Sequence, residues 1–299
     1  MASLPTTAVA QHTTQSAPER QNWQLHTLYG RVESVTERIY RQSSANPTTQ
    51  DSLCSWHEWR FNERGDVALY ASGNNKREIL TQEIYTYNTQ GLTQSVDCYT
   101  TETSHLYSIL YSYNDMGQLL QSATYRNDTL LSREIYSYTE QGYLAEKQRY
   151  LTSDELDYQH TFLYNERGDE IEERSVDKWG ERVESNEIEY DSEGRIIRKA
   201  LYLSSPSPIS EQQYSYDQAG NLTQIIYYDY DGSLWRQTLR SYDSQNRLCE
   251  QRHYNAKGKM TNKELLFYDE QGNIIRKAFL RGTQPKPYSH IEYEIVYRK

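Results

Sequence analysis

The sequence has little of what a thick aliphatic core requires. Only 36% of its 299 residues are hydrophobic, and 4 Phe stand against 29 Tyr. No apolar run is long enough to predict a transmembrane helix. No segment has the 3.6-residue periodicity of a crossover helix, which argues against an α/β fold. We therefore expect an all-β protein whose sheet is faced with tyrosine, since that ring buries apolar area while its hydroxyl stays at a wet edge.

Motifs of common enzyme classes are also missing. The chain contains no GxSxG, HExxH, GxGxxG, P-loop or CxxC sequence. His57, His105, His160 and His253 share no position in any pattern and are interpreted as ordinary strand or turn residues. A triad assembled by the fold lies beyond a search for linear motifs. The prediction is a protein that is not an enzyme and uses no cofactor.

Two sets of residues bear on metal binding. Cys54, Cys98 and Cys249 have no ligand-like spacing and are interpreted as isolated, half-buried thiols. Asp229 and Asp231 precede a Gly in the segment DYDGS and could offer oxygen atoms to Ca²⁺. The other positions of an EF-hand loop and its distal Glu are missing, so a polar hairpin turn is the better interpretation. No metal site is predicted.

The charge of the chain is predominantly negative. Its formal net charge is -10, and no run of Lys and Arg interrupts this excess. A partner such as nucleic acid or an anionic membrane would need a basic face, so neither is expected. The acidic stretches 169–173 and 184–193 are interpreted as solvated strand faces rather than paired catalytic carboxylates.

One pattern recurs through most of the chain: an aromatic residue, Asn or Asp, two polar residues, Gly, a spacer and an aliphatic residue. Seven of the intervals between copies are 26 residues and one is 25. A fixed period of this length is typical of a repeat array, in which each unit packs mainly on its neighbours. The nine units begin at Phe61, Tyr87, Tyr113, Tyr138, Tyr164, Tyr190, Tyr216, Tyr242 and Tyr268.

The second and fifth positions of each unit predict a tight turn. The second position holds Asn, Asp or, once, Thr, whose side chains accept hydrogen bonds from the turn that they begin. The fifth position requires a left-handed backbone, for which Gly is suited and Asn is the best substitute. The predicted structural turn residues are Gly65, Gly91, Gly117, Gly142, Gly168, Gly194, Gly220, Asn246 and Gly272.

Alternating residues on both sides of each turn predict two half-buried strands per unit. Rings recur two residues apart before the turn, as at Tyr85 and Tyr87, and a polar second turn closes the unit. The aliphatic residue after the turn is assigned to Val67, Leu92, Leu119, Leu144, Ile171, Ile196, Leu222, Leu248 and Ile274.

Together with end strands at 32–40 and 291–297, the nine units predict an antiparallel meander of 18–20 strands. Whether such a sheet stays open, coils or closes on itself does not follow from the repeat. Open sheets of more than about 10 strands tend to curl, so we expect a long, strongly twisted or coiled sheet. Its last strand, 291–297, is a candidate free edge.

The organisation of the chain follows from where the period begins. Residues 1–22 lack periodicity and are rich in Thr, Gln, Ser and Ala, so they are expected to be a disordered leader or the remnant of a signal peptide. Ala8-Val9-Ala10 has the small-x-small form of a signal-peptidase site, but a charged start and a full apolar core are missing before it. Residues 23–299 are predicted to form a single repeat domain.

The repeat resembles the YD repeat of the RHS family. The match is clearest in YDSEGRI at 190–196, YDQAGNL at 216–222 and YDEQGNI at 268–274. The lead-in LYGRVESVTE at 28–37 is similar to the opening of small secreted or lipid-anchored bacterial YD-repeat proteins. The resemblance implies a cell-surface or secreted β-rich protein that binds carbohydrate, contacts other cells or forms a shell around a toxin. The core motif and toxin segment of larger members are absent from this sequence, and the array is short for enclosing a cargo protein.

From these observations we expect a non-enzymatic cell-envelope or secreted scaffold that presents a Tyr-rich β surface to a glycan or a protein, in an extracytoplasmic location. The alternative is an accessory subunit of an envelope assembly or secretion complex, docked through the array or an edge strand. The residues that would contact a ligand cannot be singled out, because all units resemble one another.

Overall fold

The chain is described by a computed structural model over residues 28–42, 51–101, 104–152 and 154–299. Every regular element in these ranges is a β-strand. The described residues accordingly contain no helix that is long and apolar enough to span a membrane. The expected leader at 1–22, including Ala8-Val9-Ala10, lies outside the described residues.

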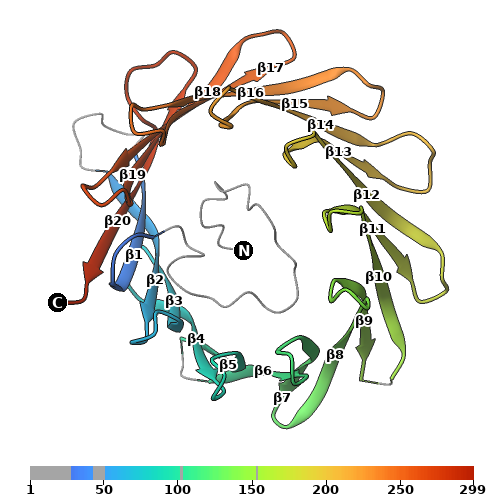
Figure 1. The fold of residues 1–299 in the computed structure, drawn as a ribbon. Coiled ribbons are helices and arrows are strands. Elements are labelled where there is room, and N and C mark those ends of the chain that lie inside the picture. Colours follow the sequence, from blue (N-terminus) through green and yellow to red (C-terminus); the bar gives the residue numbers. More distant parts are fainter. Residues whose placement is uncertain (1–27, 43–50, 102–103, 153) are drawn as a thin grey trace.

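The strands follow one another in chain order around a ring (Figure 1). They are β1 (Val32–Arg41), β2 (Ser52–Phe61), β3 (Val67–Asn74), β4 (Ile79–Tyr87), β5 (Thr93–Thr100), β6 (His105–Tyr113), β7 (Leu119–Arg126), β8 (Thr129–Tyr138), β9 (Leu144–Leu151), β10 (Leu156–Tyr164), β11 (Glu170–Asp177), β12 (Arg182–Tyr190), β13 (Ile196–Tyr202), β14 (Ser210–Tyr216), β15 (Leu222–Asp229), β16 (Leu234–Tyr242), β17 (Leu248–Asn255), β18 (Met260–Tyr268), β19 (Ile274–Arg281) and β20 (Ser289–Tyr297).

Each strand pairs antiparallel with the next, which confirms the all-β meander. The sheet then closes into a barrel, because β1 pairs with β20 as well as with β2 (Figure 1). The expectation of a long coiled sheet was therefore wrong. So was the free edge at 291–297, since β20 pairs with β19 on one side and β1 on the other. Closure satisfies the backbone groups that an open edge would leave unpaired.

Side chains fasten this closure. The Asn273 amide accepts a hydrogen bond from the backbone N–H of Tyr29 at 2.6 Å and donates to the Tyr29 carbonyl at 2.9 Å. Asn273 also donates to the Tyr297 hydroxyl at 2.6 Å. Farther along the seam, the Arg38 guanidinium lies 2.6 Å from the Glu294 carboxylate. These bonds join the two ends of the described chain, which no local pattern in the sequence specifies.

All nine tight turns have the same backbone form. The residue at the fifth position has positive φ throughout, from 65° at Asn246 to 94° at Gly272. Its N–H donates to the carbonyl of the second residue, as Gly91 does to Asn88 at 2.9 Å. The Asn88 side-chain oxygen in turn accepts from the N–H groups of Gln90 and Leu92, both at 3.0 Å. This pair of side-chain bonds explains why Asn or Asp begins the turn.

The hydroxyl of each repeated tyrosine has a fixed partner. The Tyr113 hydroxyl donates to the Thr93 carbonyl at 2.8 Å, twenty residues earlier, at the start of a neighbouring strand. The same bond recurs from Tyr87, Tyr138, Tyr164, Tyr190, Tyr216, Tyr242 and Tyr268. A phenylalanine could not make this bond, which accounts for Tyr rather than Phe at these eight positions.

The acceptors of these bonds also correct two assignments. In the second and fifth units, the residues equivalent to Val67 and Leu119 are Thr93 and Glu170, whose carbonyls accept from Tyr113 and Tyr190. Leu92 and Ile171 therefore lie one position out of register. A polar residue is tolerated at the equivalent position because its backbone carbonyl, rather than its side chain, fastens the tyrosine.

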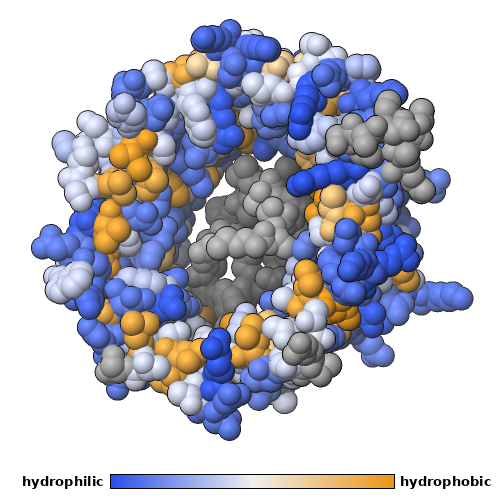
Figure 2. Space-filling view, turned by 180° about the vertical axis from the view of Figure 1, so that it is seen from behind, coloured by the Kyte–Doolittle hydropathy of each residue, from blue (hydrophilic) through white to orange (hydrophobic). Residues whose placement is uncertain are grey.

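The sheet has two unlike faces. The side that carries the repeated tyrosines, called the tyrosine face, also carries most of the large buried side chains, among them Trp59, Val96 and Leu119. The opposite side is more exposed: Ile84 retains 39%, Leu110 48% and Ile135 36% of its surface. Hydrophobic and hydrophilic patches alternate around the ring (Figure 2). Side chains on the concave side of a closed sheet lie closer together than those on its convex side. The greater burial of the tyrosine face therefore places it on the inside of the ring.

The second turns, at the other end of the ring, vary more. Several reproduce the tight-turn geometry, with positive φ at Gly180, Gly232 and Gly258. The third unit instead uses two residues of positive φ, Asn127 and Asp128. Variation is thus concentrated at one end, while the tight turns form a uniform rim at the other.

Candidate functional site

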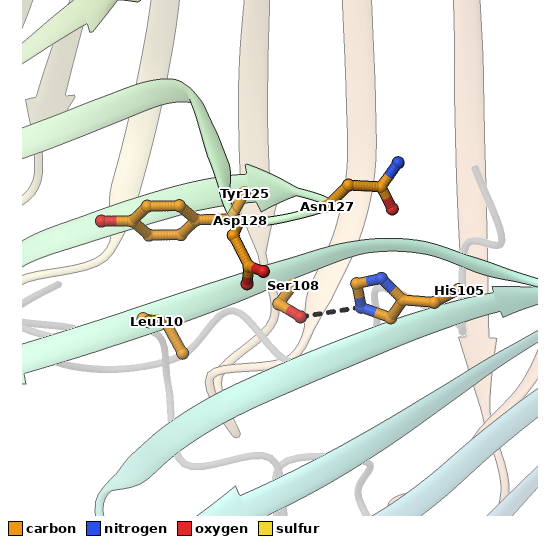
Figure 3. A pocket seen from close by; sticks show the side chains of 6 residues that line it. All are labelled: His105, Ser108, Leu110, Tyr125, Asn127 and Asp128. Carbon is orange, nitrogen blue, oxygen red and sulfur yellow. Dashed lines mark hydrogen bonds between the residues drawn. The ribbon is translucent and has the colours of Figure 1, made fainter.

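An outer pocket of about 450 Å³ lies beside β6 and β7. His105, Ser108 and Leu110 come from β6, and Tyr125 with the turn residues Asn127 and Asp128 from the next hairpin (Figure 3). In Figure 3 these side chains lie in front of β6 and β7, with the strands of the opposite wall behind, so this pocket opens on the outside of the ring.

Two residues of the outer pocket, a serine and a histidine, lie beside the carboxylate of Asp97 on β5. The Ser108 hydroxyl lies 2.8 Å from His105 Nε2 (Figure 3). It also donates to Asp97 Oδ1 at 2.5 Å. In a catalytic triad the imidazole stands between the other two, with one ring nitrogen toward each. Here the same nitrogen, Nε2, faces both Ser108 and Asp97, the latter at 3.8 Å. The carboxylate competes for the serine proton instead of orienting the imidazole, so the cluster lacks the order that activates a nucleophile.

The other predicted residues remain apart in the structure. His57 contacts the Tyr70 hydroxyl at 2.8 Å, His160 the Glu173 carboxylate at 2.7 Å and His253 the Thr238 hydroxyl at 3.0 Å. Burial lowers the pKa of both His57 and His253, which favours their neutral forms. Each of these histidines bonds a residue of the adjacent strand, and the three lie in different parts of the ring.

The predicted metal-binding candidates likewise have local roles. The Asp229 and Asp231 carboxylates accept hydrogen bonds from the N–H groups of Tyr230 and Ser233, at 2.8 and 2.9 Å. Cys98 is buried, while Cys54 and Cys249 are partly buried, and all three are free thiols. In the portion of the chain that the structure describes, no three His, Cys, Asp or Glu side chains gather as metal ligands.

A larger depression, called the rim groove, lies on the tyrosine face at the tight-turn end. Its volume is about 600 Å³, and it extends over the turns of the seventh, eighth and ninth units. It is lined by Tyr29, Tyr216, Gly220, Asn221, Leu222, Arg240, Tyr242, Gln245, Asn246, Arg247, Leu248, Tyr268, Glu270, Gln271, Gly272 and Ile274.

The groove occurs where a covering side chain is short. In the units on either side of the seventh, the sixth residue is an arginine that lies over the tyrosine ring of the next unit: Arg195 lies 4.9 Å from the Tyr216 ring centre, and Arg247 4.6 Å from that of Tyr268. In the seventh unit this residue is Asn221, which is too short to reach across the Tyr242 ring. It donates instead to the Asn246 side chain at 2.6 Å. The Tyr242 ring therefore lacks the cover that Arg195 and Arg247 give to Tyr216 and Tyr268, and all three rings line the groove.

Two arginines of the groove differ in their partners. Arg247 is neutralised by Asp243, whose carboxylate lies 2.8 Å from its guanidinium. Arg240 donates from Nε to the Gln251 amide oxygen at 2.8 Å, a neutral partner. Burial raises the pKa of Tyr242, and raises that of Tyr268 to about 12. Both hydroxyls thus stay protonated and keep their bonds to the Leu222 and Leu248 carbonyls.

Sequence reasoning did not identify the rim groove, although two departures from the repeat mark it. Asn221 occupies a position that holds Arg in the units on either side, and Arg240 occupies one that holds Tyr in the unit before it. These two departures point to a groove only once the structure shows that a side chain of one unit can lie over the tyrosine ring of the next.

No protein-family model matches the chain, and no curated protein matches it either. Among solved structures, a porin-like protein from Bacteroides uniformis is 12% identical with a TM-score of 0.39, over 90% of this chain and 98% of that one. TcdB2-TccC3 without its hypervariable C-terminal region is 12% identical with a TM-score of 0.33, over 82% of this chain but only 17% of its own length.

A third similar structure is the N-terminal domain of the effector SpvB from Salmonella typhimurium, which is 13% identical with a TM-score of 0.26, over 84% of this chain and 87% of that one. Likeness at these TM-scores carries no conclusion about what this chain binds or does.

Proposed function

We propose that this chain is a non-enzymatic scaffold of the cell envelope or the extracellular space that binds a glycan in the rim groove. The observation that carries the proposal is the Tyr242 ring, which lines a groove bordered by planar polar side chains. An aromatic ring can pack on the C–H face of a sugar, while amides and guanidinium groups bond its hydroxyls. Gln245, Asn246 and Gln271 supply such amides.

Two further features support a scaffold over an enzyme. Ser108 and His105 of the outer pocket and the neighbouring Asp97 are in the wrong order for a triad. The nine in-phase turns support a relationship to YD-repeat proteins, and the extracytoplasmic location is proposed on that resemblance.

The proposal is tested by a substitution that places an arginine over the Tyr242 ring. Asn221→Arg would place a guanidinium over Tyr242 and beside Asp217, as Arg195 is placed beside Asp191 at 2.7 Å. We expect this variant to fold normally and to lose binding on a glycan array. Tyr242→Phe keeps the ring and should keep binding. The matched control is Tyr164→Phe, whose ring is already covered by Tyr143 at 4.9 Å. Retention of full binding by Asn221→Arg would contradict the proposal.

A second candidate function is docking of a protein partner on the outside of the array, as in an accessory subunit of an envelope assembly. Docking through a free β20 edge is excluded, because both sides of β20 are paired. The observation that favours docking on the face is the exposed row Ile84, Leu110 and Ile135, at the same position of three successive units. Leu110→Glu should then abolish capture of one defined partner from the native envelope fraction while glycan binding is retained.

A further inference from the structure

We infer that the rim groove selects a glycan carrying a carboxylate, and that Arg240 receives this group. The inference rests on the proposed function, because it names the ligand class of the same groove. It is carried by the position of Arg240, by its partners and by the charges around it.

Arg240 stands in a row that is otherwise apolar or aromatic. The row comprises the residue two before each repeated aromatic, and its other members in the nine units are Trp59, Tyr85, Tyr111, Tyr136, Phe162, Ile188, Tyr214 and Leu266. A guanidinium in such a layer carries a desolvation penalty that an anion can offset. The substitution of a charged residue at one position of a repeat, inside a groove, therefore requires a reason beyond packing.

The structure gives Arg240 no anionic partner among the described residues. Its Nε bonds the Gln251 amide oxygen, and the Gln251 amide nitrogen donates to the Glu264 carboxylate at 2.8 Å. Glu264 also lies 3.8 Å from the Lys277 ammonium. Gln251 is therefore held with its oxygen toward Arg240, while the nearest carboxylate in this chain of bonds is shared with another cation.

The fixed Nε bond orients the guanidinium without neutralising it. One further N–H bonds the Tyr242 hydroxyl. The others can donate to both oxygens of a carboxylate, a geometry that arginine favours. Arg247 does not compete for this role, because Asp243 already accepts from its Nε at 2.8 Å. Glu270 also lines the groove and is the acidic side chain that would oppose an anionic ligand. Removing its charge should therefore strengthen binding.

The test compares a galacturonic acid trisaccharide with its neutral methyl ester by titration calorimetry at low salt. We expect the acid to bind the unaltered protein about tenfold more tightly, as a charge-assisted pair provides. Arg240→Gln should remove this preference and leave the affinity for the ester unchanged. Arg240→Tyr restores the aromatic row and should remove the preference in a fold at least as stable. Glu270→Gln should raise the affinity for the acid alone.

The outcomes separate the two proposals. Binding of neither sugar would overturn glycan binding in the groove and this inference with it. Equal binding of acid and ester would overturn the inference alone, as would an unchanged preference in Arg240→Gln. Tighter binding of a sulfated trisaccharide than of the uronic acid would also overturn the assignment of a carboxylate. Thermal melting of each variant confirms that it is folded.

Discussion

The first five units and the last four build the same turn from different side chains. Units 1–5 begin the turn with Asn or Thr, as at Asn114 and Asn165, whereas units 6–9 begin it with Asp, as at Asp191 and Asp243. In Figure 1 the two sets occupy the blue-to-green and the yellow-to-red parts of the ring. The backbone is the same in both, since every turn has positive φ at its fifth residue.

The difference extends to the sixth residue of the turn. In three units of the first set the Asn amide donates to an acceptor there, as Asn165 does to the Asp169 carboxylate at 3.0 Å. The other two units have Leu92 and Tyr143 at this position. In the second set the Asp carboxylate accepts from a donor, as Asp191 does from Arg195 Nε at 2.7 Å. Donor and acceptor have exchanged places along one geometry. Where the second and sixth side chains bond each other, the turn therefore specifies a complementary pair rather than a residue type.

The exchange also has a consequence for function. A donor at the sixth position can be an arginine long enough to cover the next ring, or an asparagine that leaves it open, as Asn221 does. The rim groove therefore lies in the half of the ring that uses Asp, where the covering residue varies between Arg and Asn. In the other half, Tyr143 covers Tyr164 at 4.9 Å.

The largest predicted effect tests the positive φ at the fifth residue of the turn, which the two halves share. Gly117→Val and Gly194→Val should each lower the free energy of unfolding by about 1–3 kcal/mol, because a β-branched residue is forced to positive φ. An added Cβ would meet only ordinary contacts at both sites, 3.5 Å from Leu92 and 3.6 Å from Arg167. Denaturant unfolding measures the loss. Asn at either site should cost less, since Asn246 has φ of 65°, and equal costs for Val and Asn would refute the strain.

A smaller effect tests the direction of the hydrogen bond between the second and sixth side chains, in which the halves differ. Asn165→Asp places a second carboxylate against Asp169 and should cost about 1–2 kcal/mol at neutral pH, because a hydrogen bond becomes a repulsion. Asp169→Asn in the same chain should restore most of the loss, since the donor and acceptor are complementary again. A double-mutant cycle by denaturant unfolding gives the coupling, and additive losses would show that the pair is not complementary.

Much of the common geometry could be predicted from the sequence, while closure and the groove could not. The positions of Asn88 and Gly91 specify a turn through local backbone chemistry. Closure depends instead on bonds such as that between Tyr29 and Asn273, 244 residues apart, and curvature accumulates over all strands. The groove depends on Asn221, whose length matters only because of the ring that it faces.

A comparable loss is expected in both halves when one tyrosine hydroxyl is removed. Tyr164→Phe and Tyr190→Phe each leave a carbonyl without its donor, at Leu144 and Glu170. Each change should cost about 1 kcal/mol, the usual contribution of such a bond. Thermal unfolding of the two variants measures it. A loss in one variant only would mean that the hydroxyl bond is structural in that half and incidental in the other.

The smallest predicted effect is an acid sensitivity of turns that begin with Asp, compared with first-half turns that hold no carboxylate at their second or sixth position. Hydrogen bonds from Asn221 hold the pKa of Asp217 below its usual value, and those from Arg247 do the same for Asp243. A lowered folded-state pKa contributes stability that is present above the unfolded-state pKa of about 3.9 and is lost as pH falls through the folded-state value.

The asparagines that begin turns in the first half do not titrate over this range. Acidification from pH 5 to 2.5 should therefore raise amide exchange at Gly220 and Asn246 more than at Gly91 and Gly117, after correction for the intrinsic rate. Hydrogen-exchange mass spectrometry resolves the two sets. Asp217→Asn should abolish the sensitivity of its own turn, because the amide cannot be protonated in this range. A uniform acid response around the ring would show instead that the half-buried carboxylates of the tyrosine face, such as Glu134, dominate the titration.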